Sequence, residues 1–225
     1  MVHAANTLLE DNLRQMDWSL LTVDFKNAFN TIDRGIIFAQ LTEHCPRILP
    51  WVKSMYAAPT LLFHGEHVLQ SRTGVQQGDP LGPMLFALGL LPLLKTIKTE
   101  CPDLALSAWI LDDGTLIGPS PSVRQALGII ENQQGVSGLV VNRDKCDLFW
   151  PGGNDAHDPH TGQFPGDLRR SEDGVKLLGA AVSAEADFHA KIFTARVEKA
   201  AHIIHQITDL DDPTCELLLL RISYR

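Results

Sequence analysis

The sequence predicts an α+β domain, with a mainly antiparallel sheet backed by helices and with further helices at the C-terminal end. Helices separate many of the candidate strands along the chain, an order typical of this class. Two places carry hairpin signals, in which apolar runs flank a short polar turn. The 225 residues, 44% of them hydrophobic, suffice for one large domain or for one domain with an appendage.

Apolar spacing, caps and breakers predict the elements of the first half of the chain. These elements are a helix over residues 3–16, a buried strand at Trp18–Phe25 ending at Asp24, a helix capped by Asp33 and running to about His44, a helix from Pro46 to about Ala57, and a hairpin of Thr60–Phe63 with Val68–Thr73.

The second half begins with a loop rich in glycine and proline and a helix that is apolar nearly all round, so we expect this helix to be buried. The elements expected are the loop Gly74–Pro83, the helix Leu85–Lys98, a hairpin around Asp112 and Asp113, a helix from the Pro119–Ser122 segment to about Gln134, short strands at Leu139–Val141, Cys146–Trp150 and Val175–Leu178, and helices at about Ala184–Thr208 and Pro213–Tyr224.

The stretch Pro151–Gly174 is polar and rich in Gly, Asp, His and Pro, which predicts a long, mobile loop. The side chains that could suggest a metal site within it are Asp155, His157, Asp158 and His160. A hydrated loop explains these residues better than a metal site.

The charge balance argues against autonomous tight binding of nucleic acid, because such proteins usually carry a basic footprint. The net charge is −8 and the pI is about 5.5. Four cysteines lie far apart, so free thiols in a reducing, intracellular compartment are the default, without distinguishing cytoplasm from nucleus. No segment has the length of a membrane span, and the N-terminus shows no signal segment.

Adjacent Asp112 and Asp113 sit between apolar runs and precede Gly114, a pattern of strand, tight turn and strand. An Asp-Asp-Gly surface turn is the ordinary explanation. Asp24, at the end of another buried strand, offers a second explanation. Three carboxylates at strand ends could meet at one edge of a sheet, where they would bind two Mg²⁺ ions for phosphoryl transfer.

Five ordered motifs over about residues 20–180 resemble those of reverse transcriptases, with the non-LTR retrotransposon and group II intron branch as the closest in character. They are Leu21-Thr22-Val23-Asp24-Phe25-Lys26-Asn27-Ala28-Phe29, the loop Gly74–Pro83 (GVQQGDPLGP), Ile110-Leu111-Asp112-Asp113, Gly138–Cys146 (GLVVNRDKC) and Lys176-Leu177-Leu178-Gly179.

The resemblance implies a polymerase palm and a role for each matching residue. Asp24, Asp112 and Asp113 would bind two Mg²⁺ ions, with Mn²⁺ as an alternative, and the backbone carbonyl of Phe25 would join them. Phe29 would exclude a ribose 2′-hydroxyl; a core aromatic is its other explanation. Further roles fall to Gln77 and Gly78, which would line the nucleotide and the templating base, and to Lys145, which would protonate pyrophosphate or else be a solvated lysine. Pro80 and Pro83 would in any case shape the loop.

Two features separate the chain from RNA-dependent RNA polymerases, which share the palm arrangement. Those enzymes carry an acid where this chain has Phe29, and a Ser/Thr/Asn set on the helix that here reads Met84–Gly89. A DNA-synthesising polymerase is therefore the preferred interpretation over an RNA-synthesising one. The chain departs from the reverse transcriptase pattern at Ile110, where Tyr or Phe is usual, and at Gly82, where Ser is usual.

The resemblance divides the chain into a palm at residues 1–183 and C-terminal helices at 184–225, the start of a thumb-like part. The family has a fingers region with basic residues before the first aspartate. Here few residues precede Asp24, and Arg14 is the one Lys or Arg among them. The fingers are therefore expected to be largely missing. An active chain would bind an RNA or DNA template with a primer and dNTPs. It would need the missing fingers and thumb segments, or a partner chain that supplies them. No membrane association is expected. The alternative is an inactive, truncated or repurposed remnant that folds alone or binds a partner.

Overall fold

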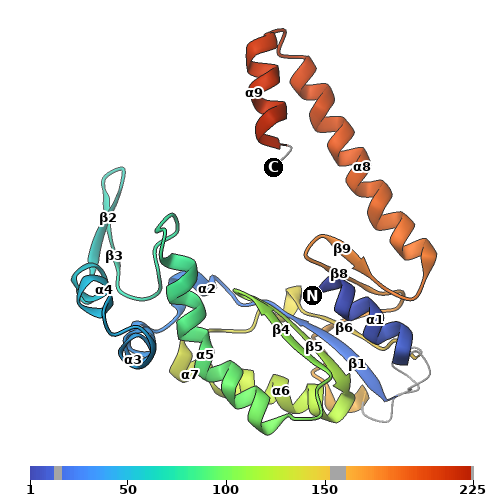
Figure 1. Ribbon diagram of the computed structural model, residues 1–225, viewed down its shortest axis with the longest axis horizontal. Helices are drawn as coiled ribbons and strands as arrows, with labels where there is room; N and C mark the ends of the chain where they lie inside the picture. Colours follow the sequence, from blue (N-terminus) through green and yellow to red (C-terminus); the bar gives the residue numbers. More distant parts are fainter. Residues whose placement is uncertain (13–16, 153–160, 224–225) are drawn as a thin grey trace.

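The computed structural model describes residues 1–12, 17–152 and 161–223. Its centre is a five-stranded sheet in the order β4–β5–β1–β6–β7, shown in Figure 1. The strands are β1 (Trp18–Val23), β4 (Leu106–Ile110), β5 (Asp113–Pro119), β6 (Asp147–Phe149) and β7 (Arg169–Ser171). All neighbours pair antiparallel except β6 and β7, which are parallel. The prediction of an α+β domain with a mainly antiparallel sheet is confirmed.

Alternation along β1 places its side chains on both faces of the sheet. Leu20 and its cross-strand partner Ile117 pack with α1 (Val2–Asn12) and with the small hairpin of β8 (Val175–Leu177) and β9 (Ala180–Val182). Leu21 and Leu116 face the opposite layer, formed by α5 (Gly82–Glu100) and α6 (Ser120–Asn132). Burial of each leucine contributes about 1.5–3 kcal/mol, so both layers hold β1 and β5 firmly in place.

Three helices follow β1: α2 (Ala28–Thr31), α3 (Arg34–His44) and α4 (Leu49–Tyr56). The predicted cap is confirmed, because the Asp33 carboxylate accepts a hydrogen bond from the backbone N–H of Ile36 at 3.0 Å. The next helix was expected to begin at Pro46, but it begins at Leu49. A helix from Pro46 would need a backbone N–H at Pro50 to bond the Pro46 carbonyl, and proline has none.

The predicted hairpin is confirmed as β2 (Thr60–His64) and β3 (His67–Ser71), which project from the body of the molecule (Figure 1). Its apolar side chains are exposed on both strands, including Leu61, Phe63 and Leu69.

The helix predicted at Leu85–Lys98 is α5, which begins earlier, at Gly82. The expectation that it is buried holds for one side only, since Leu85 and Phe86 are buried while Met84 is exposed.

The structure corrects two further expectations. Leu139–Val141 is not a strand; it makes one isolated bridge, between Val141 and Phe25, and follows the short helix α7 (Gln134–Ser137). The predicted long loop contains a 3₁₀ turn, η3 (Thr161–Gln163), and strand β7, which hydrogen-bonds to β6. Strand β7 forms because it pairs with β6, more than twenty residues earlier in the chain. The local sequence does not encode this pairing. The four residues of the suggested metal site in this loop (Asp155, His157, Asp158 and His160) lie outside the described residues, as do Arg14 and the end of the first predicted helix.

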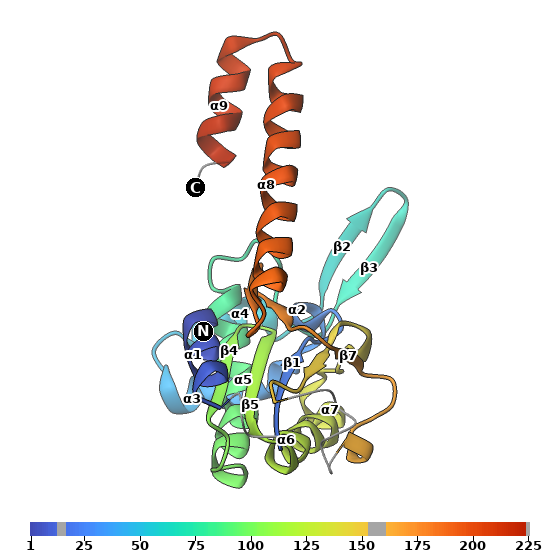
Figure 2. The same cartoon turned by 90° about the vertical axis from the view of Figure 1, so that its right-hand side faces the viewer.

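Two helices end the described chain, α8 (Ala186–Thr208) and α9 (Pro213–Ser223), close to their predicted bounds. In Figures 1 and 2, α8 extends away from the sheet, and α9 folds back beside α8. Their exposed apolar side chains include Phe193, Ile204 and Leu217. Within the described ranges, we find no helix with the length and apolar character to cross a membrane.

Candidate active site

Asp24 follows β1 directly, and the segment 142–146 holds it at three points. The backbone N–H of Asn142 donates to the Asp24 carbonyl at 2.8 Å, and the Asn142 side-chain amide donates to Asp24 Oδ1 at 3.0 Å. The Asp24 N–H in turn points at Cys146 Sγ, 3.5 Å away. The Asp24 backbone and one of its carboxylate oxygens are therefore held by this segment.

The Asp112–Asp113 hairpin turns one residue earlier than expected. Ile110 pairs with Asp113, so Leu111 and Asp112 form the turn, and Asp113 already begins β5. Leu111 has a φ of 56°, a left-handed conformation that costs a residue with a Cβ about 1–3 kcal/mol. The turn is thus strained directly beside both aspartates.

The strand register brings Asp24 and Asp113 together. Val23 lies opposite Gly114 in the antiparallel pair of β1 and β5, so the next residues along, Asp24 and Asp113, face each other. Asp113 loses part of its hydration there and is repelled by Asp112 and Asp24, and these effects raise the pKa of its carboxyl, while Lys145 lowers it. The Asp113 side chain as a whole stays exposed to solvent.

A solvent-open cleft of about 310 Å³ lies over these residues. Its lining includes Asp24, Asp113, Lys145, Arg169 and Lys176. Lys145 ends a 3₁₀ turn, η1 (Arg143–Lys145). The backbone N–H of Lys145 donates to the Asn142 carbonyl at 2.9 Å and so holds the turn in shape. Four aspartates and three basic side chains therefore border one space, with Asp144 and Asp147 as the other two carboxylates.

The residues present fit a divalent cation in their chemistry. Hard cations prefer carboxylate oxygens, and a cation between Asp24 and Asp113 would relieve the repulsion that raises the pKa of Asp113. Asp112 does not line the cleft. Across the described part of the chain, no three His, Cys, Asp or Glu side chains are gathered as a ready metal-binding group.

Phe29, Gln77 and Gly78 line a second hollow, of about 430 Å³, together with Pro80 and Pro83. The Phe29 ring stacks on Phe86, with ring centres 4.6 Å apart, so it is both a packed aromatic and a wall of the hollow. Gly78 has a φ of 93°, a backbone conformation that favours glycine.

The Phe25 ring belongs to the core. The ring is only 3% exposed and stacks on Trp109 at 5.9 Å. Trp109 in turn covers Gly114, where an added Cβ would lie 2.5 Å from the indole. This packing supports the strand ends that carry Asp24 and Asp113.

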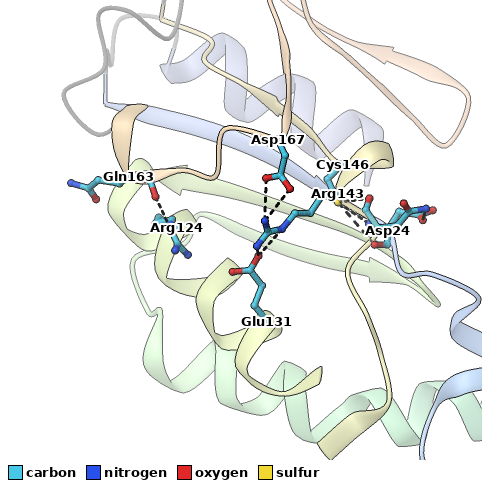
Figure 3. A network of polar contacts seen from close by, with 8 residues as sticks. Asp24, Arg124, Glu131, Arg143, Cys146, Gln163 and Asp167 are labelled. Atoms are coloured by element: carbon cyan, nitrogen blue, oxygen red, sulfur yellow. Dashed lines mark hydrogen bonds and ion pairs between the residues drawn. The ribbon is translucent and has the colours of Figure 1, made fainter. Parts of the chain in front are cut away.

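An ion-pair network secures the segment that carries Lys145. Figure 3 shows Arg143 between Glu131 of α6 and Asp167, with Cys146 and Asp24 nearby. Arg143 Nη1 lies 3.0 Å from one Asp167 carboxylate oxygen, and Arg143 Nε lies 3.1 Å from Glu131 Oε1. The guanidinium group holds the pKa of Asp167 below its usual value.

Sequence reasoning missed the supporting roles of Asn142, Arg143 and Cys146. All three belong to the GLVVNRDKC segment, so the motif was visible while its contacts with Asp24, Glu131 and Asp167 were not. Ile110, at a position where the motif usually has an aromatic residue, is 47% exposed at the rim of the turn. At Gly82, an added Cβ would lie 3.2 Å from the Gln76 carbonyl oxygen, so the backbone here leaves little room for a side chain.

The family model described as reverse transcriptase (RNA-dependent DNA polymerase) matches residues 3–182 of this chain. The chain belongs to the reverse transcriptase family. It is 28% identical over 138 residues to the retrotransposable element SLACS 132 kDa protein of Trypanosoma brucei gambiense. That match covers 58% of this chain and 12% of the relative, so the chain spans only a small part of that protein's length.

Solved structures give the same fold. Telomerase from Candida albicans, in complex with a fragment of telomeric RNA, matches with a TM-score of 0.57 at 14% identity, covering 81% of this chain and 33% of that one. Apo telomerase from Candida tropicalis, truncated of its C-terminal domain, matches with a TM-score of 0.55 at 16% identity, covering 80% and 36% of the two chains. At these identities the likeness shows the fold alone.

Proposed function

We propose that this chain is the palm of an RNA-directed DNA polymerase and that its cleft joins a deoxynucleotide to a primer 3′ end. The observation that carries the proposal is the placement of Asp24 opposite Asp113 in one cleft with Lys145. Membership of the reverse transcriptase family supports it. Two Mg²⁺ ions, when bound, would activate the primer hydroxyl and neutralise the triphosphate.

In this proposal Asp24, Asp113 and Asp112 hold the ions, and the Phe25 carbonyl completes the oxygen set. Asp112 does not line the cleft, so the proposal requires its carboxylate to turn inward. Lys145 donates a proton to the departing pyrophosphate as the primer oxygen bonds to the α-phosphorus. Its η1 turn, anchored through Arg143, keeps its ammonium group near Asp113.

We assign the incoming nucleotide to the hollow of Phe29, Gln77 and Gly78. The Phe29 ring, fixed by stacking on Phe86, would meet a 2′-hydroxyl and so favour deoxynucleotides. Gly78 leaves open space beside its backbone, since nothing lies within 4 Å of an added Cβ. A templating base could approach there.

The proposed polymerase works within a larger retroelement protein; this rests on the match with the SLACS relative, which covers 12% of that protein. Residues 1–183 would be the palm and 184–225 the start of a thumb-like part. Template, primer and the remaining polymerase segments, on this chain's parent protein or on a partner, would complete the enzyme.

The second candidate function is a catalytically inactive module that binds a protein partner. The exposed apolar side chains of the β2–β3 hairpin and of α8 and α9 favour it, as does the net charge of −8. Primer extension on poly(rA)/oligo(dT) with Mg²⁺ distinguishes the two functions. The polymerase proposal predicts extension by the folded chain together with the polymerase segments that complete it; no extension by that assembly, in a sample with a cooperative unfolding transition, would favour the inactive module.

A matched variant tests the metal assignment of Asp112. Asp112→Asn should abolish extension and keep the fold, because the amide cannot supply a carboxylate to the ions but is nearly the same size. Extension and a thermal melt are measured on the same preparation. Retained extension with an unchanged melt would remove Asp112 from the proposed metal site.

A further inference from the structure

A buried chain of polar contacts links Arg34 at the start of α3, Tyr56 at the end of α4, and Asp79 in the loop before α5. Arg34 is 7% exposed and Tyr56 is 4% exposed. Burying polar and charged groups is costly unless they are hydrogen-bonded, so such a chain has a structural purpose. None of these three residues belongs to the proposed metal site.

Arg34 closes the base of the β2–β3 hairpin. Among the described residues, its guanidinium group contacts no carboxylate; it donates to carbonyl and hydroxyl oxygens on segments that converge there, and it lies 5.2 Å from the centre of the Tyr56 ring. Burial lowers the pKa of Arg34. The acceptors are the carbonyls of Tyr56 at 3.2 Å, Ser71 at 3.2 Å, Thr73 at 3.1 Å and Gly74 at 2.8 Å, and the Ser71 hydroxyl at 2.9 Å.

Tyr56 continues from this base to the loop that borders the Phe29 hollow. Its hydroxyl donates to Asp79 Oδ2 in a short hydrogen bond and accepts from the Gln76 N–H at 3.2 Å. The other Asp79 oxygen accepts from the Leu81 N–H at 2.9 Å. One hydroxyl therefore holds both ends of the Gln76–Asp79 turn, with Gln77 and Gly78 between them.

We propose that Tyr56 is a positioning residue that acts through Asp79 to set Gln77 and Gly78 for the incoming nucleotide. This inference rests on the proposed polymerase function. Tyr56 does not line the hollow, whereas Asp79, Gln77 and Gly78 do. The tyrosine thus acts on the nucleotide only by fixing the loop, and Arg34 fixes the tyrosine.

Tyr56→Phe removes the hydroxyl and keeps the ring over Arg34. We expect the KM for dTTP on poly(rA)/oligo(dT) to rise about tenfold, the scale of losing one hydrogen bond to a charged group. The KM for template-primer and the kcat should change much less. Asp79→Asn keeps an oxygen acceptor for Tyr56 and should give a smaller rise.

Ser54→Ala is the matched control. It also deletes one hydroxyl from α4, but that hydroxyl bonds the Trp51 carbonyl at 2.7 Å on the exposed side of the helix. Its KM for dTTP should equal that of the wild type. An unchanged dTTP KM in Tyr56→Phe, or an equal rise in Ser54→Ala, would overturn the positioning role.

Hydrogen exchange separates this inference from the polymerase proposal. The Gln76 and Leu81 amides should exchange faster in Tyr56→Phe than in wild type or Ser54→Ala, since their acceptors depend on the Tyr56–Asp79 bond. If the wild type extends no primer, the proposed function fails for this chain, and the exchange data still decide the loop's anchoring. Equal exchange in all three proteins would overturn the inference in either case.

Discussion

Like charges side by side are the central feature at the residue scale. Asp113 begins β5 opposite Asp24 and next to Asp112, and partial loss of hydration, together with repulsion from both neighbours, raises the pKa of its carboxyl. The positive φ of Leu111 adds backbone strain at the same turn. A protein gains nothing in stability from this arrangement, which is why it points to function.

The pKa of Asp113 leads to a prediction with a definite sign. Its folded-state pKa is raised above the unfolded value, so the ionised carboxylate destabilises the metal-free fold above the folded pKa, and protonation relieves this as pH falls. Asp113→Asn should therefore stabilise the metal-free protein at pH 7, by less than about 1 kcal/mol because water screens an exposed group. The gain should vanish as pH falls through the folded pKa of Asp113.

Urea unfolding of both proteins in EDTA, from neutral pH downward, measures this difference. Asp187→Asn, at the start of α8, makes the same charge change away from the cleft. It should show no such pH-dependent gain. A neutral or negative effect of Asp113→Asn at pH 7 would show that the carboxylates do not repel one another in the fold.

Gly114 supports the same strand end by having no side chain. An alanine there would place its Cβ 2.5 Å from the Trp109 ring, and Trp109 also stacks on Phe25. We expect Gly114→Ala to destabilise the protein by about 1–3 kcal/mol, the usual cost of overpacking. Gly128→Ala in α6, where the nearest atom is the flexible end of Arg124 at 3.4 Å, should instead be neutral or stabilising. Comparable melting temperatures for the two variants would contradict this packing argument.

At the element scale, local chemistry was predictable and distant pairing was not. The Asp33 cap, the His64–His67 hairpin turn and the apolar run of β1 all depend on neighbours within a few residues, and the structure confirms them. By contrast, β7 exists because it pairs with β6, and Asn142 acts because it reaches Asp24. Such contacts cross more than twenty residues of chain and leave no local periodicity to find.

The Asp33 cap can be tested as an element-scale stabiliser. Asp33→Ala leaves the Ile36 N–H without its acceptor and should lower the free energy of unfolding by about 1 kcal/mol. Asp33→Asn should change it little, because asparagine caps helices about as well as aspartate. Chemical denaturation of both variants measures the effect; equal losses would mean that charge, not capping, is the contribution of Asp33.

At the scale of the whole molecule, the sheet carries two adjoining sites on one framework. The β1 and β5 ends border the carboxylate cleft, while α2, the loop before α5 and the first turn of α5 line the Phe29 hollow. The motifs grouped Asp24 with Asp113 and Phe29 with Gln77 and Gly78, and the structure places each of these groups along one space. They did not predict that Asp112 lies outside the cleft lining, or that α8 projects away from the sheet with α9 folded back beside α8 (Figure 2).

The most direct test of the central claim is primer extension by Asp24→Asn beside Asp187→Asn, which has the same net charge. If the Asp24–Asp113 cleft is the polymerase site, Asp24→Asn should lose at least about a hundredfold in extension rate, as expected when a group that stabilises transition-state charge is removed. Asp187→Asn should retain the wild-type rate, and both should melt cooperatively. Extension by folded Asp24→Asn at the rate of Asp187→Asn would contradict the assignment of this cleft.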